Sequence, residues 1–110
     1  MAEIDEIVQT IERLEAALED LAVRGLRSAG PQDLAGLDAL HEEFERIGAG
    51  HLAGRIAAVT AAIRNDDRSA AAALLRARAS LRVFERVLTL EVAGGVLGSM
   101  AATDQGEDDA

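Results

Sequence analysis

Apolar residues recur along most of this chain at intervals of three and four positions, the spacing that places side chains on one face of an α-helix. The clearest example is the segment from Glu3 to Arg24, whose apolar seam consists of Ile4, Ile7, Ile11, Leu14, Leu18 and Leu21. Such a seam suits an intermolecular coiled coil or a single antiparallel neighbour within a bundle. The short length of the chain favours the neighbour within the bundle.

Two shorter helices are predicted from Gln32 to Ile47 and from His51 to Arg64, because their apolar residues keep the helical spacing. Gly25 is expected to end the first helix and Pro31 to begin the second, since Gly is common just after a helix and Pro at its first position. The sequence Gly48-Ala49-Gly50 separates the second helix from the third. All three connections are short.

The last predicted helix, from Asp67 to Val92, has the widest apolar face, and Asp67 or Ser69 can cap its start. At about 100° per residue its apolar side chains cover an arc of roughly 200°. They are Leu74, Ala77, Leu81, Val83, Phe84, Val87, Leu88, Leu90 and Val92. We therefore expect the other helices or a second chain to cover this helix from two or more directions, with Phe44 and Phe84 both buried.

Beyond Val92 the sequence changes in character. Gly94, Gly95 and Gly98 occur within five residues, and each Gly destabilises a helix by about 1 kcal/mol relative to Ala, so the helix is expected to break there. The tail from Ala101 to Ala110 is acidic, with nothing apolar larger than Ala, which is typical of a disordered segment. This divides the chain into a helical domain over residues 1–100 and a tail over residues 101–110.

These patterns predict an all-α protein, an up-and-down antiparallel four-helix bundle followed by a disordered acidic tail. Short connections place consecutive helices side by side and antiparallel. A chain of 110 residues is long enough to bury one core without disulfides, and it contains no Cys.

Composition narrows the possible partners and cofactors. The formal net charge of -9 repels phosphate backbones, and two aromatic residues leave little for bases to stack on, so nucleic-acid binding is disfavoured. No apolar stretch approaches the ~20 residues that cross a bilayer, and Met1 is followed by acidic residues rather than a basic and apolar leader. We expect a cytoplasmic protein with no membrane partner, and its Ala and Arg usage suggests a GC-rich bacterial genome.

One segment has a partial resemblance to a metal site. His41-Glu42-Glu43-Phe44-Glu45 is similar to the helix of zinc proteases, in which a second His at the fifth position shares the metal. Here the fifth position is Glu45, so the segment is interpreted as a solvated pair of side chains four residues apart. We expect no metal and no cofactor.

The last predicted helix also carries the candidate binding residues. Arg78, Arg82 and Arg86 are four residues apart on one edge, so their like charges repel unless something negative faces them. The acidic edge of the first helix, formed by Glu12, Glu15 and Glu19, is one counterpart, and an anionic ligand or partner is the other. Together with the surplus apolar face, this edge predicts a partner-binding surface of Arg78, Arg82, Val83, Arg86, Val87 and Leu90.

A broader resemblance covers residues 18–90. The succession Gly25-Leu26, Pro31, Ile47-Gly48 and Leu52-Ala53-Gly54-Arg55-Ile56, followed by a long Ala/Leu/Arg helix, resembles the helical region of bacterial SWIM zinc-finger proteins. Those proteins are associated with MoxR-type AAA+ ATPases and von Willebrand A-domain proteins, so the resemblance implies a scaffold or adaptor. The Cys residues of the zinc finger are missing here, and metal or nucleic-acid roles are not implied.

Two classes of function follow from these observations. The first is a non-enzymatic interaction or scaffold module that forms a homodimer or joins a larger bacterial assembly. The second is a small all-helical enzyme or ligand-binding bundle, which requires a polar pocket between helices.

Overall fold

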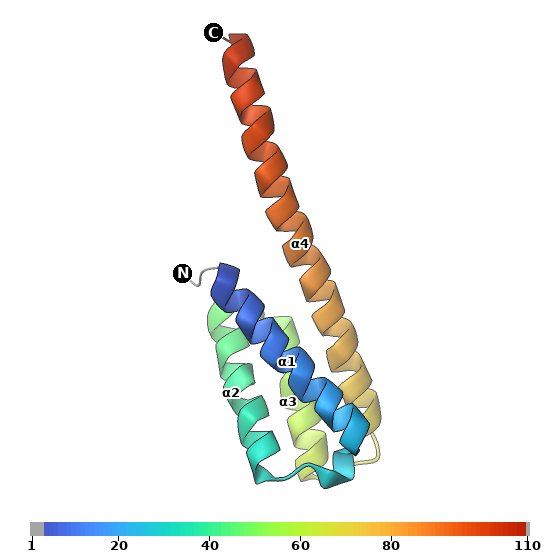
Figure 1. The fold of residues 1–110 in the computed structure, drawn as a ribbon. Coiled ribbons are helices and arrows are strands. Elements are labelled where there is room, and N and C mark those ends of the chain that lie inside the picture. The colour runs from blue at the N-terminus through green and yellow to red at the C-terminus, as the bar shows by residue number, and fades with distance from the viewer. Residues whose placement is uncertain (1–3, 110) are drawn as a thin grey trace.

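A computed structural model describes the backbone of residues 4–109 and the side chains of residues 4–94. Within residues 4–109 it contains no strand and four α-helices, with one short 3-10 helix between the first two. The elements are α1 (Ile4–Arg24), η1 (Leu26–Ser28), α2 (Pro31–Ile47), α3 (Gly50–Arg64) and α4 (Ala70–Asp109). Consecutive helices run in opposite directions (Figure 1). The predicted all-α, up-and-down bundle is therefore confirmed.

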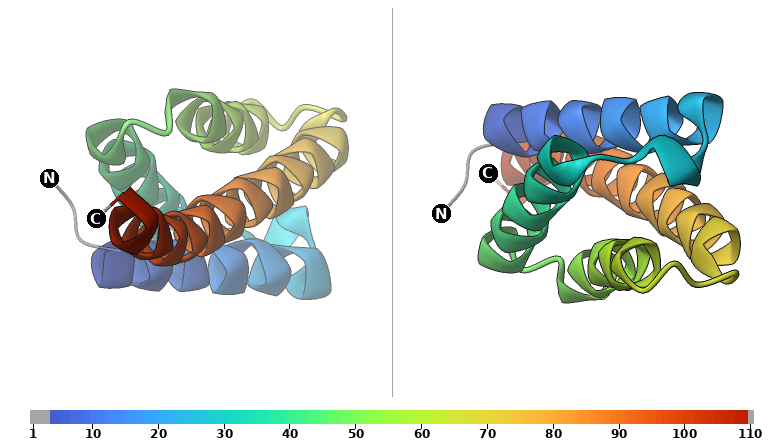
Figure 2. Two further views of the ribbon diagram at one scale, coloured as in Figure 1. Left: turned by 90° about the horizontal axis from the view of Figure 1, so that it is seen from above. Right: turned by 90° about the horizontal axis from the view of Figure 1, so that it is seen from below.

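The four helices form a ring in which each helix packs on the two beside it. Figure 2 shows α1 next to α2 and α4, with α3 on the far side of the bundle. The α2–α3 and α3–α4 pairs pack most extensively, whereas α1 makes a lighter contact with each neighbour. The core lies inside this ring.

The helix boundaries follow from local chemistry. Gly25 and Gly48 have φ angles of 91° and 95°, in the region that Gly adopts without a Cβ clash, and each follows a helix. Pro31 is the first residue of α2, as predicted. The Asp33 carboxylate accepts a 2.8 Å hydrogen bond from the Gly30 N–H and pairs with Arg24 at 2.8 Å, which connects the end of α1 to the start of α2.

The largest fully buried side chains come from α1, α2 and α3. They are Leu14, Leu18 and Leu21 of α1, Leu37 and Phe44 of α2, and Ile56 and Val59 of α3. From α4, the buried residues are Ala70, Ala73, Leu74, Ala77 and Leu81. Four residues of the apolar seam predicted for the first helix, from Ile11 to Leu21, are thus buried in the bundle, whereas Ile7 is half-buried and Ile4 is 51% exposed.

The expectation that both Phe residues are buried is wrong for one of them. Phe44 has no exposed surface, but Phe84 is only partly buried. The two rings meet edge to face, with centroids 6.0 Å apart and planes at 89°. Phe84 lies beside the α2–α3 turn, where Gly48 and Gly50 have no side chains to cover its outer edge.

The predicted end of the last helix is also corrected, because α4 continues past Val92 to Asp109. Figure 1 shows this part of α4 extending beyond the other three helices. Each Gly weakens a helix without forbidding it, and no Pro interrupts the segment. Side chains after Gly94 lie outside the described part of the structure, so the predicted disorder of the tail from Ala101 to Ala110 stays a prediction.

None of the helices over residues 4–109 is both long and apolar enough to cross a lipid bilayer.

Candidate interaction surface

The three apolar residues predicted to bind a partner lie on the outer side of α4. Val83, Val87 and Leu90 are 61%, 47% and 65% exposed, and we call these three residues the α4 face. They sit three and four positions apart, so their side chains project from one side of the helix. The core contacts of the same helix, such as Leu74 and Leu81, are on its other side. Three large apolar side chains in one line are therefore left in contact with water.

A shallow groove adjoins the α4 face. It has a volume of about 370 Å³ and separates α4 from the turn between α2 and α3. Val83, Phe84 and Val87 line its α4 side, while residues 48–52 line the other. Because two of those turn residues are Gly, the wall on that side is low and the groove opens toward the α4 face. A helix lying on the α4 face would also contact this turn.

Two of the predicted binding arginines of α4, Arg78 and Arg82, lie on the side that faces α1. Arg82 and Arg86 are exposed, Arg78 is half-buried, and Glu15 of α1 lines a small hollow with Arg78 and Arg82. The predicted acidic counterpart is thus represented in this hollow by Glu15. Among residues 4–94, no ion pair within 4.0 Å joins these arginines to α1.

Glu85 lies in the same hollow, and its pKa is raised. Loss of hydration on partial burial is the main cause, and the negative charge of Glu15 adds to it. Arg82 acts in the opposite direction and lowers the pKa. The contact between α1 and α4 therefore places the carboxylates of Glu15 and Glu85 in the same hollow.

The structure shows a polar contact that the sequence analysis missed. Thr10 of α1 is buried, and its hydroxyl oxygen lies 2.9 Å from the Glu6 carbonyl oxygen and 3.2 Å from the Glu43 carboxylate. Arg13 donates to that carboxylate and to the Thr10 hydroxyl, so α1 and α2 are connected by charge as well as by packing. The sequence offered one sign that Thr10 is buried, because Thr10 directly precedes Ile11 of the apolar seam.

The candidate metal ligands do not come together. His41 lies 3.3 Å from Glu45, measured from Nε2 to Oε1, within one turn of α2, while His51 is exposed at the groove described above. Within residues 4–94 no three side chains of the types His, Cys, Asp or Glu are grouped to hold a metal ion. The hollow beside His41 also contains Asp38 and Arg64, and these two pair with each other at 2.6 Å.

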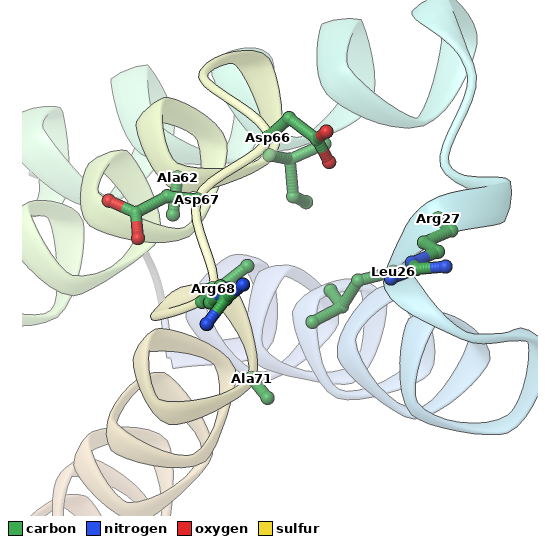
Figure 3. A pocket seen from close by; sticks show the side chains of 9 residues that line it. Leu26, Arg27, Ala62, Asp66, Asp67, Arg68 and Ala71 are labelled. Carbon is green, nitrogen blue, oxygen red and sulfur yellow. The ribbon is translucent and has the colours of Figure 1, made fainter.

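A hollow of about 600 Å³ lies at the base of the bundle between η1 and the α3–α4 connection. Figure 3 shows that the carboxylates of Asp66 and Asp67 point away from one another. Asp67 accepts a 2.9 Å hydrogen bond from the Ser69 N–H, which lowers its pKa and orders the start of α4. The acidic residues of this hollow are thus arranged by the local turn rather than around a common point.

Comparison of the chain with protein-family models, with curated proteins and with solved structures found no match.

Proposed function

We propose that this protein is a non-enzymatic helical interaction module that binds a protein partner through the α4 face. The observation that carries the proposal is the joint exposure of Val83, Val87 and Leu90 on one side of α4, a helix that extends beyond the other three. Covering such a side chain completely is worth about 1.5–3 kcal/mol. Three of them in a line supply a substantial driving force for association.

The geometry of the surface supports a helical partner. The α4 face is a narrow stripe with a groove beside it, and apolar stripes at helical spacing are the usual contact surfaces of amphipathic helices. Arg82 and Arg86 are exposed near the stripe and can form a charged rim. The competing interpretation, a small helical enzyme, requires ionisable side chains that are available to a substrate. Arg13 and Arg64 do not favour it, because each is paired with a carboxylate of α2.

The resemblance of residues 18–90 to the helical region of SWIM zinc-finger proteins favours a scaffold or adaptor role, and it stays a prediction. The cytoplasmic location and the bacterial source expected from the sequence also stay predictions. A role in an assembly agrees with an exposed binding stripe, since a scaffold needs a surface that its own fold leaves open.

The experiment compares the wild-type chain with the double variant Val83→Glu/Leu90→Glu. Leu75→Glu is the matched control, because Leu75 is also on α4 and 66% exposed but lies outside the α4 face. One measurement is the solution mass by light scattering over a hundredfold concentration range. The other is the set of proteins captured from a lysate of the source cells.

We expect the wild type and Leu75→Glu to associate, with themselves or with a captured protein, and the double variant to lose that association. Circular dichroism should show the same helix content in all three chains. The proposal is overturned if the wild-type chain stays at 11.5 kDa and captures no protein beyond those that the double variant also captures.

A further inference from the structure

We propose that the partner of the α4 face is a second copy of this chain, with the two α4 helices side by side and parallel. This inference rests on the proposed function and adds the identity and orientation of the partner. The α4 face is the centre of a longer line of positions three and four residues apart, which we call the α4 seam: Ser80, Val83, Val87, Leu90 and Gly94. That spacing is the contact line of a two-stranded coiled coil.

The residue types at two positions of the α4 seam fit a pair of helices rather than a larger assembly, if the helices run parallel. In parallel two-stranded coiled coils, a β-branched residue at the first core position of the heptad is best followed by Leu at the second. Val87 and Leu90 occupy these two positions when Ser80, Val87 and Gly94 are the first core positions and Val83 and Leu90 the second. Both side chains are exposed, so pairing requires no rearrangement of the bundle core.

Charge complementarity fixes the orientation. Arg86 and Glu91 lie on opposite flanks of the α4 seam, five residues apart, and both are exposed. In a parallel pair these two flanking positions face each other across the interface, so each copy brings its Arg86 to the partner's Glu91. In an antiparallel pair, each flank meets the same flank of the other helix, and the Arg-to-Glu pairing is lost. Within residues 4–94 neither side chain forms an ion pair inside its own chain.

The position of the α4 seam on the bundle permits this arrangement. Because the core contacts of α4 are on another side of the helix, two parallel α4 helices can touch while both bundles remain outside the pair. Each partner helix would also lie against the groove beside residues 48–52. A standard interface covers about 800 Å² per partner, and the described part of the α4 seam spans only about 21 Å of helix. We therefore expect a reversible dimer that dissociates on dilution.

The first test exchanges charges at the flanks. Arg86→Glu and Glu91→Arg should each weaken dimerisation roughly tenfold, because two attractive contacts become repulsive at the surface. The double variant Arg86→Glu/Glu91→Arg restores opposite charges across the interface, so its dissociation constant should return to within about threefold of the wild-type value. Arg27→Glu is the matched control, since Arg27 is exposed at the base of the bundle, away from the α4 seam, and the same charge change there should leave the dissociation constant unchanged. Sedimentation equilibrium measures all five chains.

The second test determines the orientation. The chain contains no Cys, so Ser80→Cys introduces one thiol per copy. Parallel helices bring the two thiols within the ~7 Å Cα separation that a disulfide allows, whereas antiparallel pairing about Leu90 separates them by several turns. We expect Ser80→Cys to form a covalent dimer under mild oxidation and Leu75→Cys, outside the α4 seam, to form none.

The outcomes separate this inference from the proposed function. A dimer that ignores the charge exchange and does not crosslink through Ser80→Cys overturns the parallel arrangement, while the interaction module stands. A monomer that captures a different protein through the α4 face overturns the second copy as partner and also leaves the module standing. A monomer that captures nothing overturns both.

Discussion

The two outer helices, α1 and α4, differ in how far their apolar residues find neighbours. In α1 the seam is buried at four successive positions, Ile11, Leu14, Leu18 and Leu21. In α4 burial is complete only up to Leu81, and the larger apolar residues that follow are half-buried or exposed. Both helices have the spacing of a buried face. The comparison teaches that an apolar pattern is buried only where another helix runs alongside it.

Polar contacts follow the same division. The inter-helix ion pairs within residues 4–94 connect α1 to α2, through Arg13 with Glu43 and Arg24 with Asp33, and α2 to α3, through Asp38 with Arg64. The arginines of α4 take no part in them. The first three helices are therefore connected by charge as well as packing, while no ion pair within residues 4–94 connects α4 to another helix.

The largest expected difference is between a buried leucine of α1 and an exposed leucine of α4. Leu14→Ala on α1 should lower the free energy of unfolding by about 2–5 kcal/mol, because the side chain is fully buried and leaves a cavity. Leu90→Ala on α4 should change it by less than about 0.5 kcal/mol in the monomer. Urea denaturation at low protein concentration measures both. Equal losses would show that Leu90 is covered within its own chain.

Phe84 lies between these extremes and tests the edge of the core. Phe84→Ala should destabilise the chain by about 2 kcal/mol, less than the 3–5 kcal/mol of a fully buried Phe, since part of the ring is already exposed. Phe44→Ala provides the comparison with full burial. If the two substitutions shift the urea midpoint equally, Phe84 is as buried in solution as Phe44.

Glycine substitutions separate the bundle from the part of α4 near its edge. Gly36 in α2 and Gly94 in α4 are both helical and have no atom within 4 Å of an added Cβ, so Ala should stabilise each helix locally by about 1 kcal/mol. Gly36→Ala should raise the urea midpoint of the whole domain. Gly94→Ala should instead slow amide hydrogen exchange around residue 94 and leave that midpoint nearly unchanged. A large shift in the midpoint with Gly94→Ala would place residue 94 inside the cooperative unit.

A smaller effect is expected from pH at the contact between α1 and α4. The pKa of Glu85 is raised in the folded chain, so its contribution to stability is present below the unfolded pKa of about 4.3 and is lost as pH rises through the folded pKa. Glu85→Gln should therefore stabilise the protein slightly at pH 7 and lose this advantage near pH 4. Urea denaturation at the two pH values measures the change, with the exposed Glu42→Gln as control. A stabilisation that is the same at both pH values would contradict a raised pKa for Glu85.

The smallest effect is expected from the end of the chain. Truncation after Met100 removes the acidic tail, which lies beyond the bundle in Figure 1, and should leave the thermal midpoint within a few degrees of the full-length value. Differential scanning calorimetry makes the comparison. A larger loss would mean that the acidic residues dock on the bundle, with the arginines of α4 as their expected partners.

Most of the fold could be predicted because its determinants are local. The ends of α1 and α2 follow from Gly25, Pro31 and Gly48, whose backbone preferences act within a few residues. The contact of Thr10 and Arg13 with Glu43 was not predictable in the same way, because it depends on the angle between α1 and α2. The end of α4 was misplaced because the expected break at Gly94 and Gly95 weighed the intrinsic preference of Gly too heavily.

The sequence by itself determined that the chain forms four amphipathic helices, and which side of α1, α2 and α3 turns inward. The physical reason is that helical spacing and turn preferences act over short stretches of chain. Only the tertiary structure decided which apolar residues of α4 are buried, since Leu81 lies among the other helices while Val83 and Leu90 face outward. A pattern records that a residue favours burial, but whether a neighbour reaches it depends on the lengths and directions of the other helices.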